Sequence, residues 1–304
     1  MKRKELFFRL VIMVTAICCL TPVLVSGQTA TKTNTRADSS AILETALNYM
    51  EGAYTADADR MQKALWPELH KITIRTIPQT GRTILASNGY SQLIEGVRDS
   101  KALVNNSDKK IKVTIEVINE GMACVKITSS MFNDFLQLAN LDGQWKIINV
   151  LWNWGVDSPR RDKSIIFDSD KEKVGIEGAA MDYIDGFFSG DALRMERAIH
   201  PEINKVTIVT SRVTGKSFLT KMGSGPLIEY TSAKLGLLEK EKRGITVRIM
   251  DSMDNMASVE VISATLYDYL QLAKVDGNWK IINVLWKSKM SPSRKKKSPI
   301  FRMR

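Results

Sequence analysis

The stretch from Asp134 to Trp152 reads DFLQLANLDGQWKIINVLW, and the stretch from Asp268 to Trp286 reads DYLQLAKVDGNWKIINVLW. Fifteen of the 19 aligned positions are identical, at an offset of 134 residues. Two apolar, strand-like runs that flank an Asp-Gly pair are typical of a β-hairpin with a tight turn. Each stretch therefore predicts two antiparallel strands, and the identity predicts that one structural unit occurs twice.

The same offset extends the match toward the N-terminus without a gap. MQKALWPELHKITI (61–74) aligns with MERAIHPEINKVTI (195–208), Tyr49 aligns with Tyr183, and Gly81 aligns with Gly215. Two copies are too few for a solenoid, and each copy is long enough to bury its own core. The sequence therefore predicts two tandem domains of the same fold.

Within the first copy, apolar residues at helical spacing predict a helix over 39–54, and Asp57 can cap a second, short helix that stops at Pro67. A hairpin around Gly81 and a third helix over 90–104 follow. The remaining strands are predicted over 110–118, 122–130, 133–139 and 145–152. This order predicts an α+β fold in which three helices pack on the concave face of a curved, mostly antiparallel sheet.

Four short motifs of the second copy point to a family: GD at 190–191, HPE at 200–202, DYL at 268–270 and DGNWKIIN at 276–283. Through them the chain resembles the family named "putative lumazine-binding", within the nuclear transport factor 2-like superfamily that also contains SnoaL-like and ketosteroid isomerase-like proteins. The first copy departs from the pattern with Ala56 before Asp57 and with Trp66 in place of the histidine. The resemblance covers residues 38–152 and 172–286. It implies two cone-shaped domains, each with a pocket between sheet and helices, and its name implies a pterin or flavin ligand.

The N-terminus has the three parts of a secretory signal peptide. A cationic start precedes an apolar run over 10–25, and small residues end at Gly27, where we expect cleavage. A retained membrane anchor is the alternative, but the run contains Pro22 and is shorter than the roughly 20 residues that a span needs. The sequence thus predicts an exported protein, periplasmic or secreted. Only Cys124 would remain after cleavage, so no internal disulfide is expected.

The net charge of +11 is concentrated at the two ends of the chain. Residues 1–27 contribute +3 and residues 287–304 contribute +8, whereas residues 28–286 contain 32 basic and 32 acidic side chains. A neutral body argues against nucleic-acid binding. The tail is either a solvated end or a weak contact for anionic lipids. The predicted divisions are a signal peptide (1–27), a disordered segment (28–37), a first domain (38–153), a linker (154–171), a second domain (172–287) and a basic tail (288–304).

The candidate pocket residues are aromatic or polar side chains on predicted helices and strands. They are Tyr49, Trp66, Asp134, Trp145, Asn149, Tyr183, His200, Asp268, Trp279 and Asn283. Strict alternation places Asn149 on the same strand face as Trp145. A tryptophan there fits a core as well as a ligand-stacking wall, and an asparagine needs hydrogen-bond partners in either case.

Asp134 and Asp268 have two interpretations. In ketosteroid isomerase-like relatives a pocket carboxylate is the general base, and the alternative is a structural carboxylate paired with a basic group or a backbone amide. The two histidines are not equivalent in the repeat, because His70 aligns with Asn204 and His200 aligns with Trp66. Neither has further ligands at metal-binding spacing, so we expect no metal and no cofactor.

These observations favour a non-enzymatic exported protein whose two cones hold a small apolar or amphipathic ligand, or a protein partner. The alternative is an enzyme of the isomerase or dehydratase type that transfers a proton in a desolvated pocket. That enzyme needs a carboxylate or an imidazole facing a cavity. Many proteins of the superfamily that the chain resembles dimerise through their sheets. The resemblance therefore implies that the tandem makes this pair within one chain, and we expect a monomer that is a pseudo-dimer.

Overall fold

The computed structural model describes residues 35–100, 109–163, 165 and 167–289. The predicted signal peptide, most of the segment 28–37, the end of the predicted third helix and nearly all of the basic tail lie outside the described residues. Every described element belongs to one compact unit, Asn34–Arg304. Among the described residues, no helix is both long enough and apolar enough to cross a membrane.

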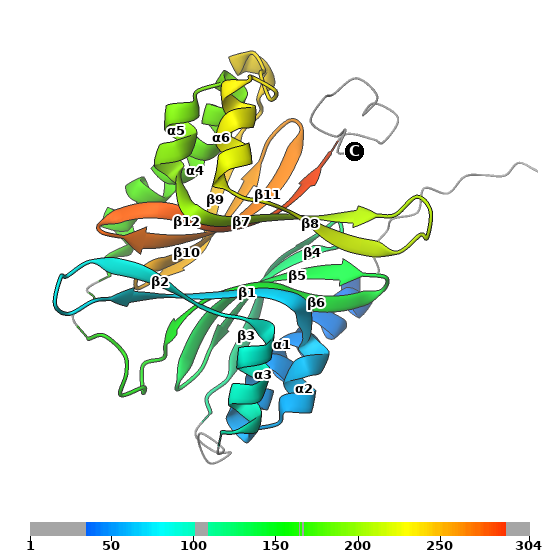
Figure 1. Ribbon diagram of the computed structural model, residues 1–304, viewed down its shortest axis with the longest axis vertical. Helices are drawn as coiled ribbons and strands as arrows, with labels where there is room; N and C mark the ends of the chain where they lie inside the picture. Colours follow the sequence, from blue (N-terminus) through cyan, green and yellow to red (C-terminus); the bar gives the residue numbers. More distant parts are fainter. Residues whose placement is uncertain (1–34, 101–108, 164, 166, 290–304) are drawn as a thin grey trace, which may run out of the picture. The chain divides into compact units, whose positions relative to one another are not determined.

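The two copies contain the same elements in the same order (Figure 1). The first has α1 (Thr35–Thr55), α2 (Ala58–Ala64), β1 (Leu65–Thr76), β2 (Thr83–Asn88), α3 (Tyr90–Arg98), β3 (Lys112–Asn119), β4 (Met122–Thr128), β5 (Phe132–Leu141) and β6 (Gln144–Trp154). The second has α4 (Ser169–Ser189), α5 (Ala192–Ala198), β7 (Ile199–Thr210), β8 (Ser217–Met222), α6 (Ser224–Ser232), the 3-10 turn η2 (Lys240–Lys242), β9 (Thr246–Met253), β10 (Met256–Ile262), β11 (Leu266–Val275) and β12 (Asn278–Ser288).

Each domain forms a six-stranded sheet, in the orders β2-β1-β6-β5-β4-β3 and β8-β7-β12-β11-β10-β9. Among the described strands, only the β1–β6 and β7–β12 pairs are parallel, so the sheets are mostly antiparallel, as predicted. The predicted Asp142-Gly143 turn is confirmed, because both residues have positive φ, 53° and 86°. This is the backbone that a two-residue hairpin turn requires. Asp276 and Gly277 repeat it in the second domain.

The second helix ends earlier than predicted. Helix α2 stops at Ala64, and Leu65 is already extended, with φ −93° and ψ 148°. The residue before a proline favours extended backbone, so Trp66 before Pro67 joins the strand rather than the helix. Strand β1 therefore contains Pro67, close to the irregular pairing with β6 between Leu65 and His70.

A β-bulge in β6 separates residues that strict alternation placed together. Gln137 pairs with Asn149 but Leu138 pairs with Ile147, so Ile148 is an extra residue. The bulge reverses the alternation. Trp145 and Ile147 pack with the helix-side core, and Asn149 faces the opposite side, where its partner Gln137 bonds to the other sheet. Ile282 is the corresponding extra residue of β12.

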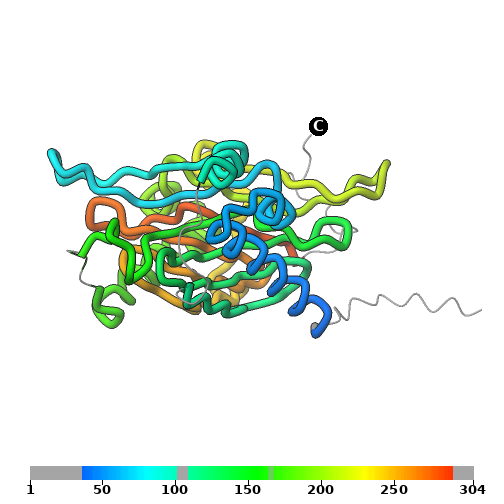
Figure 2. Tube along the Cα trace, turned by 90° about the horizontal axis from the view of Figure 1, so that it is seen from below, coloured from blue at the N-terminus to red at the C-terminus, as the bar shows by residue number. Residues whose placement is uncertain are grey.

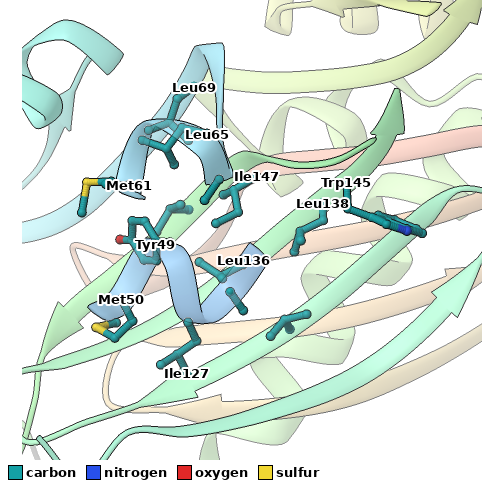
Figure 3. Close-up of a cluster of buried hydrophobic side chains, with 14 of the residues drawn as sticks. Tyr49, Met50, Met61, Leu65, Leu69, Ile127, Leu136, Leu138, Trp145 and Ile147 are labelled. Carbon is teal, nitrogen blue, oxygen red and sulfur yellow. The ribbon is translucent and has the colours of Figure 1, made fainter. Parts of the chain in front are cut away.

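The helices cover one face of each sheet, which we call the helix side (Figure 1). The core on the helix side of the first domain joins α1 and α2 to the strands, and Figure 3 labels ten side chains of this core. Trp145 lies in this core, and its Nε1 donates to Asp38 Oδ1 on α1 at 3.0 Å. Trp279 donates in the same way to Glu172 Oε2 on α4 at 2.7 Å. Both tryptophans thus fasten the first helix of their domain to the sheet.

The opposite faces of the two sheets pack against each other, and we call this the inter-sheet side. One buried cluster joins Cys124 and Ile148 to Tyr269 and Leu285, and another joins Phe135 to Ile282. The β1–β2 and β7–β8 hairpins extend at opposite ends of the pair (Figure 2). Each binds the tight turn of the other domain: Thr83 N–H donates to Asp276 Oδ1 at 2.7 Å, and Ser217 N–H to Asp142 Oδ1 at 2.8 Å.

Candidate functional site

A buried lysine joins two of the predicted residues on the helix side of the first domain. The hydroxyl of Tyr49, on α1, donates to Asp134 Oδ1, on β5, at 2.8 Å. Lys71 Nζ, on β1, donates to the Tyr49 hydroxyl at 2.7 Å and lies 3.3 Å from Asp134 Oδ1. Lys71 is 6% exposed and Asp134 is 1% exposed. The three side chains form one buried polar cluster.

The second domain repeats the cluster with Tyr183, Lys205 and Asp268. Tyr183 donates to Asp268 Oδ1 at 2.8 Å, and Lys205 Nζ lies 2.7 Å from the same oxygen and donates to the Tyr183 hydroxyl. An indole ring completes each cluster, because the Trp152 centroid lies 4.4 Å from Lys71 Nζ and the Trp286 centroid lies 4.5 Å from Lys205 Nζ. We refer to the four residues of each domain as its floor.

Strand register explains why the floor residues meet. Asp134 on β5 pairs directly with Trp152 on β6, and Lys71 on β1 pairs with Val150 on β6. Neighbouring strands therefore place the carboxylate, the indole and the ammonium side by side on the helix side. Tyr49 reaches them from the buried stripe of α1 that includes Ile42 and Ala46.

Burial controls the protonation of the floor. It lowers the pKa of Lys71 and of Lys205, against the opposing effect of the nearby carboxylate. Burial also raises the pKa of Asp134, opposed by Lys71 and by the Tyr49 hydroxyl. The pKa of each tyrosine is raised by burial and by its carboxylate neighbour, so both hydroxyls stay neutral and can donate.

The floor is not fully satisfied by its own hydrogen bonds. Asp134 Oδ2 and Asp268 Oδ2 are buried and have no hydrogen-bond partner among the described residues. Each ammonium uses two of its three N–H bonds on oxygens of the cluster. A buried polar group left in this state is a candidate for contact with a ligand or an ordered water.

Each floor lines a cavity. In the first domain Tyr49, Lys71 and Trp152 line a cavity of about 270 Å³. In the second domain Tyr183, Lys205 and Trp286 line one of about 190 Å³. Neither aspartate is among the lining residues, and the described residues that line the two cavities include no carboxylate and no imidazole. The basic group that faces both cavities is therefore an amine.

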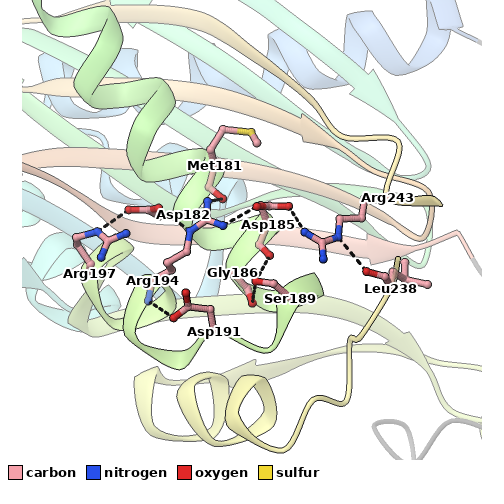
Figure 4. A network of polar contacts seen from close by, with 10 residues as sticks. All are labelled: Met181, Asp182, Asp185, Gly186, Ser189, Asp191, Arg194, Arg197, Leu238 and Arg243. Carbon is pink, nitrogen blue, oxygen red and sulfur yellow. Dashed lines mark hydrogen bonds and ion pairs between the residues drawn. The ribbon is translucent and has the colours of Figure 1, made fainter. Parts of the chain in front are cut away.

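A charged network holds one wall of the second cavity (Figure 4). Arg194 binds Asp182 at 2.9 Å and Asp185 at 2.5 Å, which joins α5 to α4. Arg243 binds the same Asp185 and also donates through Nε to the Leu238 carbonyl at 3.0 Å. Leu238 lines the cavity, so the network fastens this part of its wall to α4.

Six of the predicted site residues lie away from both cavities. Trp145 and Trp279 are core residues, as described above. Trp66 packs against the inter-sheet cluster. His200 is half-buried, and its Nδ1 accepts from the Glu202 amide at 3.1 Å.

The remaining two, Asn149 and Asn283, lie at the centre of the inter-sheet side. Asn149 donates to Gln137 Oε1 at 2.8 Å and accepts from Asn204 Nδ2 at 2.9 Å. Asn283 donates to Gln271 Oε1 at 2.8 Å, and its Oδ1 lies 2.6 Å from His70 Nδ1. Both asparagines therefore hold the two sheets together. Among the described residues, no group of three or more histidine, cysteine, aspartate or glutamate side chains is arranged to hold a metal ion.

Sequence reasoning missed the two lysines of the floor. Lys71 and Lys205 occupy aligned positions directly before the sequences ITI and VTI. They lie within the aligned stretches 61–74 and 195–208 of the repeat. Lysine is rarely buried in folded proteins, so a lysine at the start of a strand pattern normally indicates an exposed strand end. A lysine retained in both copies inside a core strand was the signal that could have found it.

The sequence matches the family described as "Putative lumazine-binding" over residues 37–153 and again over 171–287. No curated protein matches the chain. Among solved structures, an NTF2-like protein of unknown function from Shewanella baltica OS155 is 18% identical, with 40% of this chain and 97% of that chain covered and a TM-score of 0.33.

A second NTF2-like protein of unknown function, from Silicibacter pomeroyi DSS-3, is 15% identical, with 40% and 98% coverage and a TM-score of 0.33. A ketosteroid isomerase-like protein from Erwinia carotovora atroseptica SCRI1043 is 17% identical, with 40% and 99% coverage and a TM-score of 0.27. Since the family match spans most of the chain in two tandem segments, the protein belongs to the "Putative lumazine-binding" family of the NTF2-like fold, with two copies of the family's domain.

Proposed function

We propose that each domain binds a small, mostly apolar molecule that presents one acceptor oxygen to the buried lysine of the floor. The observation that carries this proposal is the ammonium group at the base of an otherwise largely apolar cavity, which occurs in both domains at aligned positions. Pockets that bind small molecules typically combine apolar walls with a few placed polar groups. A ligand-binding role also fits the family.

The charge of the floor narrows the chemistry of the ligand. Each lysine is already paired with a buried carboxylate, so the lysine–aspartate pair has no net charge. An anionic ligand would add an uncompensated charge to a desolvated site. A neutral acceptor, such as a ketone, an amide or a ring carbonyl oxygen, fits the remaining N–H bond without that penalty.

Binding accounts for the floor better than proton transfer does. A general base must reach the proton that it removes, within about 3 Å or through one water molecule. Neither aspartate is among the residues that line the cavities, and each is hydrogen-bonded to the tyrosine and the lysine that do line them. We therefore favour a binding protein over an enzyme of the isomerase or dehydratase type.

Native mass spectrometry of the mature protein from its own host tests this proposal. We expect added mass that is lost on denaturation. Lys71→Met and Lys205→Met should each remove the mass bound to their own domain. Lys146→Met and Lys280→Met are matched controls, because these lysines bind backbone carbonyls outside the cavities, of Lys63 and Arg197. A wild-type chain with only the polypeptide mass would contradict the proposal and favour a role in protein interaction.

We also propose that the protein acts outside the cytoplasm, as a monomer. The signal-like segment 1–27 supports export, and its test is the N-terminus of the mature protein, expected at Gln28. The packing of the two sheets within one chain supports a monomer. Light scattering should give the mass of a single chain, and the mass of two chains would contradict this part of the proposal.

A further inference from the structure

Each cavity is lined by one side chain that can form a covalent bond with a carbonyl compound, the lysine of its floor. Among the described residues, Lys71 is the only amine that lines the first cavity, and Lys205 is the only amine that lines the second. Primary amines condense with aldehydes and ketones, and a lysine that is desolvated in an apolar pocket acts as a nucleophile of this kind. Both floors therefore contain the reactive group for such a condensation.

The aspartate of each floor can take the proton that prevents an ammonium from reacting. Burial lowers the pKa of Lys71 and raises the pKa of Asp134, so burial favours the transfer of a proton from the ammonium to the carboxylate. Asp134 Oδ1 lies 3.3 Å from Lys71 Nζ, and Asp268 Oδ1 lies 2.7 Å from Lys205 Nζ. Each carboxylate can thus accept the proton directly from its own lysine.

The tyrosine of each floor connects the carboxylate to the cavity. The Tyr49 hydroxyl accepts from Lys71 Nζ at 2.7 Å, donates to Asp134 Oδ1 at 2.8 Å, and belongs to a side chain that lines the cavity. Tyr183 has the same contacts in the second domain. A proton held by the aspartate can therefore return through the hydroxyl to a ligand atom beside the lysine, although the aspartate does not line the cavity.

The charge of the floor selects among the reactions of a lysine. Acylation would make a neutral amide and leave Asp134 as an unpaired buried charge, which is strongly destabilising. A protonated imine keeps the positive charge on the same nitrogen, beside the same carboxylate and over the indole of Trp152, whose centroid lies 4.4 Å from Lys71 Nζ. A desolvated cavity also excludes the water that hydrolyses an imine. The floor therefore fits an aldehyde better than an acyl donor.

We propose that Lys71 and Lys205 each bind a small apolar aldehyde covalently, as a reversible protonated imine. This inference rests on the proposed function and names the class of its ligand, since the aldehyde oxygen is the neutral acceptor that first bonds to the ammonium. The protein would then hold two aldehyde molecules per chain and release them by hydrolysis.

The condensation needs no oxidant, reductant or other co-reactant. The aspartate takes one proton from Nζ, the nitrogen lone pair attacks the carbonyl carbon, and the electrons of the C=O double bond move to the oxygen. A second Nζ proton moves to that oxygen, and the proton held by the aspartate returns to it through the tyrosine. The C–O bond then breaks, water leaves with both protons, and the nitrogen lone pair forms the C=N bond. The nitrogen keeps one proton and the positive charge.

Reductive trapping with hexanal tests the inference. Ligand-free wild-type protein is mixed with limiting hexanal at about pH 7, near which floor lysines of lowered pKa have more neutral amine than ordinary lysines, and sodium cyanoborohydride converts each imine to a stable secondary amine. Peptide mapping should locate hexyl groups at Lys71 and Lys205, formed at least about tenfold faster than at Lys146 and Lys280, which corresponds to about one pKa unit.

The two comparison lysines are strict controls. Lys146 and Lys280 donate to backbone carbonyls outside the cavities, and burial lowers the pKa of both. A preference for the floor lysines therefore cannot arise from partial burial alone. Lys71→Arg keeps a positive charge beside Asp134 but forms no imine, so it should remove the label of the first domain only. The mapping of the wild type needs no variant and remains decisive if this one does not fold.

Three results would overturn the inference. The first is an equal rate of labelling at the floor lysines and at the two control lysines. The second is hexanal that is bound in native spectra but lost on denaturation after reduction, which would leave the proposed function in place without the covalent step. The third is the absence of hexanal from both floors. The ligand mass of protein from its own host, and its loss in the lysine-to-methionine variants, bear on the proposed function separately.

Discussion

The amide network at the centre of the inter-sheet side and the floors of the helix side both contain buried polar side chains, but in different states of hydrogen bonding. On the inter-sheet side, Gln137 donates to the Tyr269 carbonyl at 2.8 Å and accepts from Asn149, which in turn accepts from Asn204. On the helix side, one oxygen of Asp134 and one of Asp268 have no partner among the described residues. A network whose polar groups all have partners specifies how two surfaces fit together. A network beside a cavity with an unpartnered buried oxygen indicates a binding site.

Glu116, at the margin of the inter-sheet side, shows a third outcome. Its Oε2 accepts from Ser258 at 2.8 Å, but its Oε1 has no partner among the described residues. Burial is the main cause that raises the pKa of this carboxyl, to about 7. The side chain thus responds to burial by keeping its proton near neutral pH, whereas the floor aspartates are compensated by a lysine.

The largest effect is expected when only one of the two charged side chains of a floor is removed. Asp268→Ala leaves the buried ammonium of Lys205 without its counter-charge, which should lower the free energy of unfolding by about 3–5 kcal/mol. Lys205→Met with Asp268→Leu removes both charges and should restore most of that loss. Urea unfolding measures both variants. A loss below about 1 kcal/mol for Asp268→Ala would show that the pair behaves as if it were exposed.

A smaller effect is expected on the inter-sheet side. Asn149→Leu leaves the buried Gln137 Oε1 without its donor, which costs about 1–3 kcal/mol. Asn204 Nδ2, the other partner, is only part-buried and can bond to water. The bound mass in native spectra should not change, because Asn149 touches neither cavity. Asn283→Leu is the matched control in the other network. Loss of ligand in either variant would contradict the separation between structural and binding side chains.

The smallest effect is a pH dependence of stability that we expect from only one of the two inter-sheet networks, the one that contains His70. Burial lowers the pKa of His70 below its ordinary value, with a further lowering by Lys221 and opposing effects of Asn283 and Glu202. The unfolded chain therefore binds this proton more readily, so stability should fall as the pH drops below about 6.5. His70→Asn, which copies the aligned Asn204, should remove that part of the decrease.

Unfolding of both proteins between pH 8 and pH 5 measures this difference. Glu116 contributes with the opposite sign, since its raised pKa gives stability that is lost as the pH rises through about 7. That contribution is common to both proteins and cancels between them. Parallel pH profiles for wild type and His70→Asn would contradict the effect assigned to His70.

The sequence predicted the duplication, the mixed order of helices and strands, and the tight turns, because each depends on local pattern. The sequence predicts Tyr49 and Asp134 as pocket residues, and in the structure both bond to Lys71. The burial of Lys71 could not be predicted, because it depends on contacts between strands that are distant in the chain. The position of Asn149 could not be predicted, since Ile147 and Ile148 are equally apolar and nothing local shows which one the bulge adds. The sequence also predicts that a helix stops at Pro67, whereas this proline lies inside strand β1.

The packing of the two sheets within one chain has a consequence for how the protein can change. In a symmetric homodimer, any substitution at the interface appears twice, once on each subunit, and must suit both. In this chain a substitution at one interface position changes only one of the two domains. His70 bonds to Asn283 where Asn204 bonds to Asn149, and Trp66 aligns with His200, so the two halves already differ from each other at this interface. Covalent linkage keeps the partner at a high effective concentration, of millimolar order, and so lets each half specialise without losing the other.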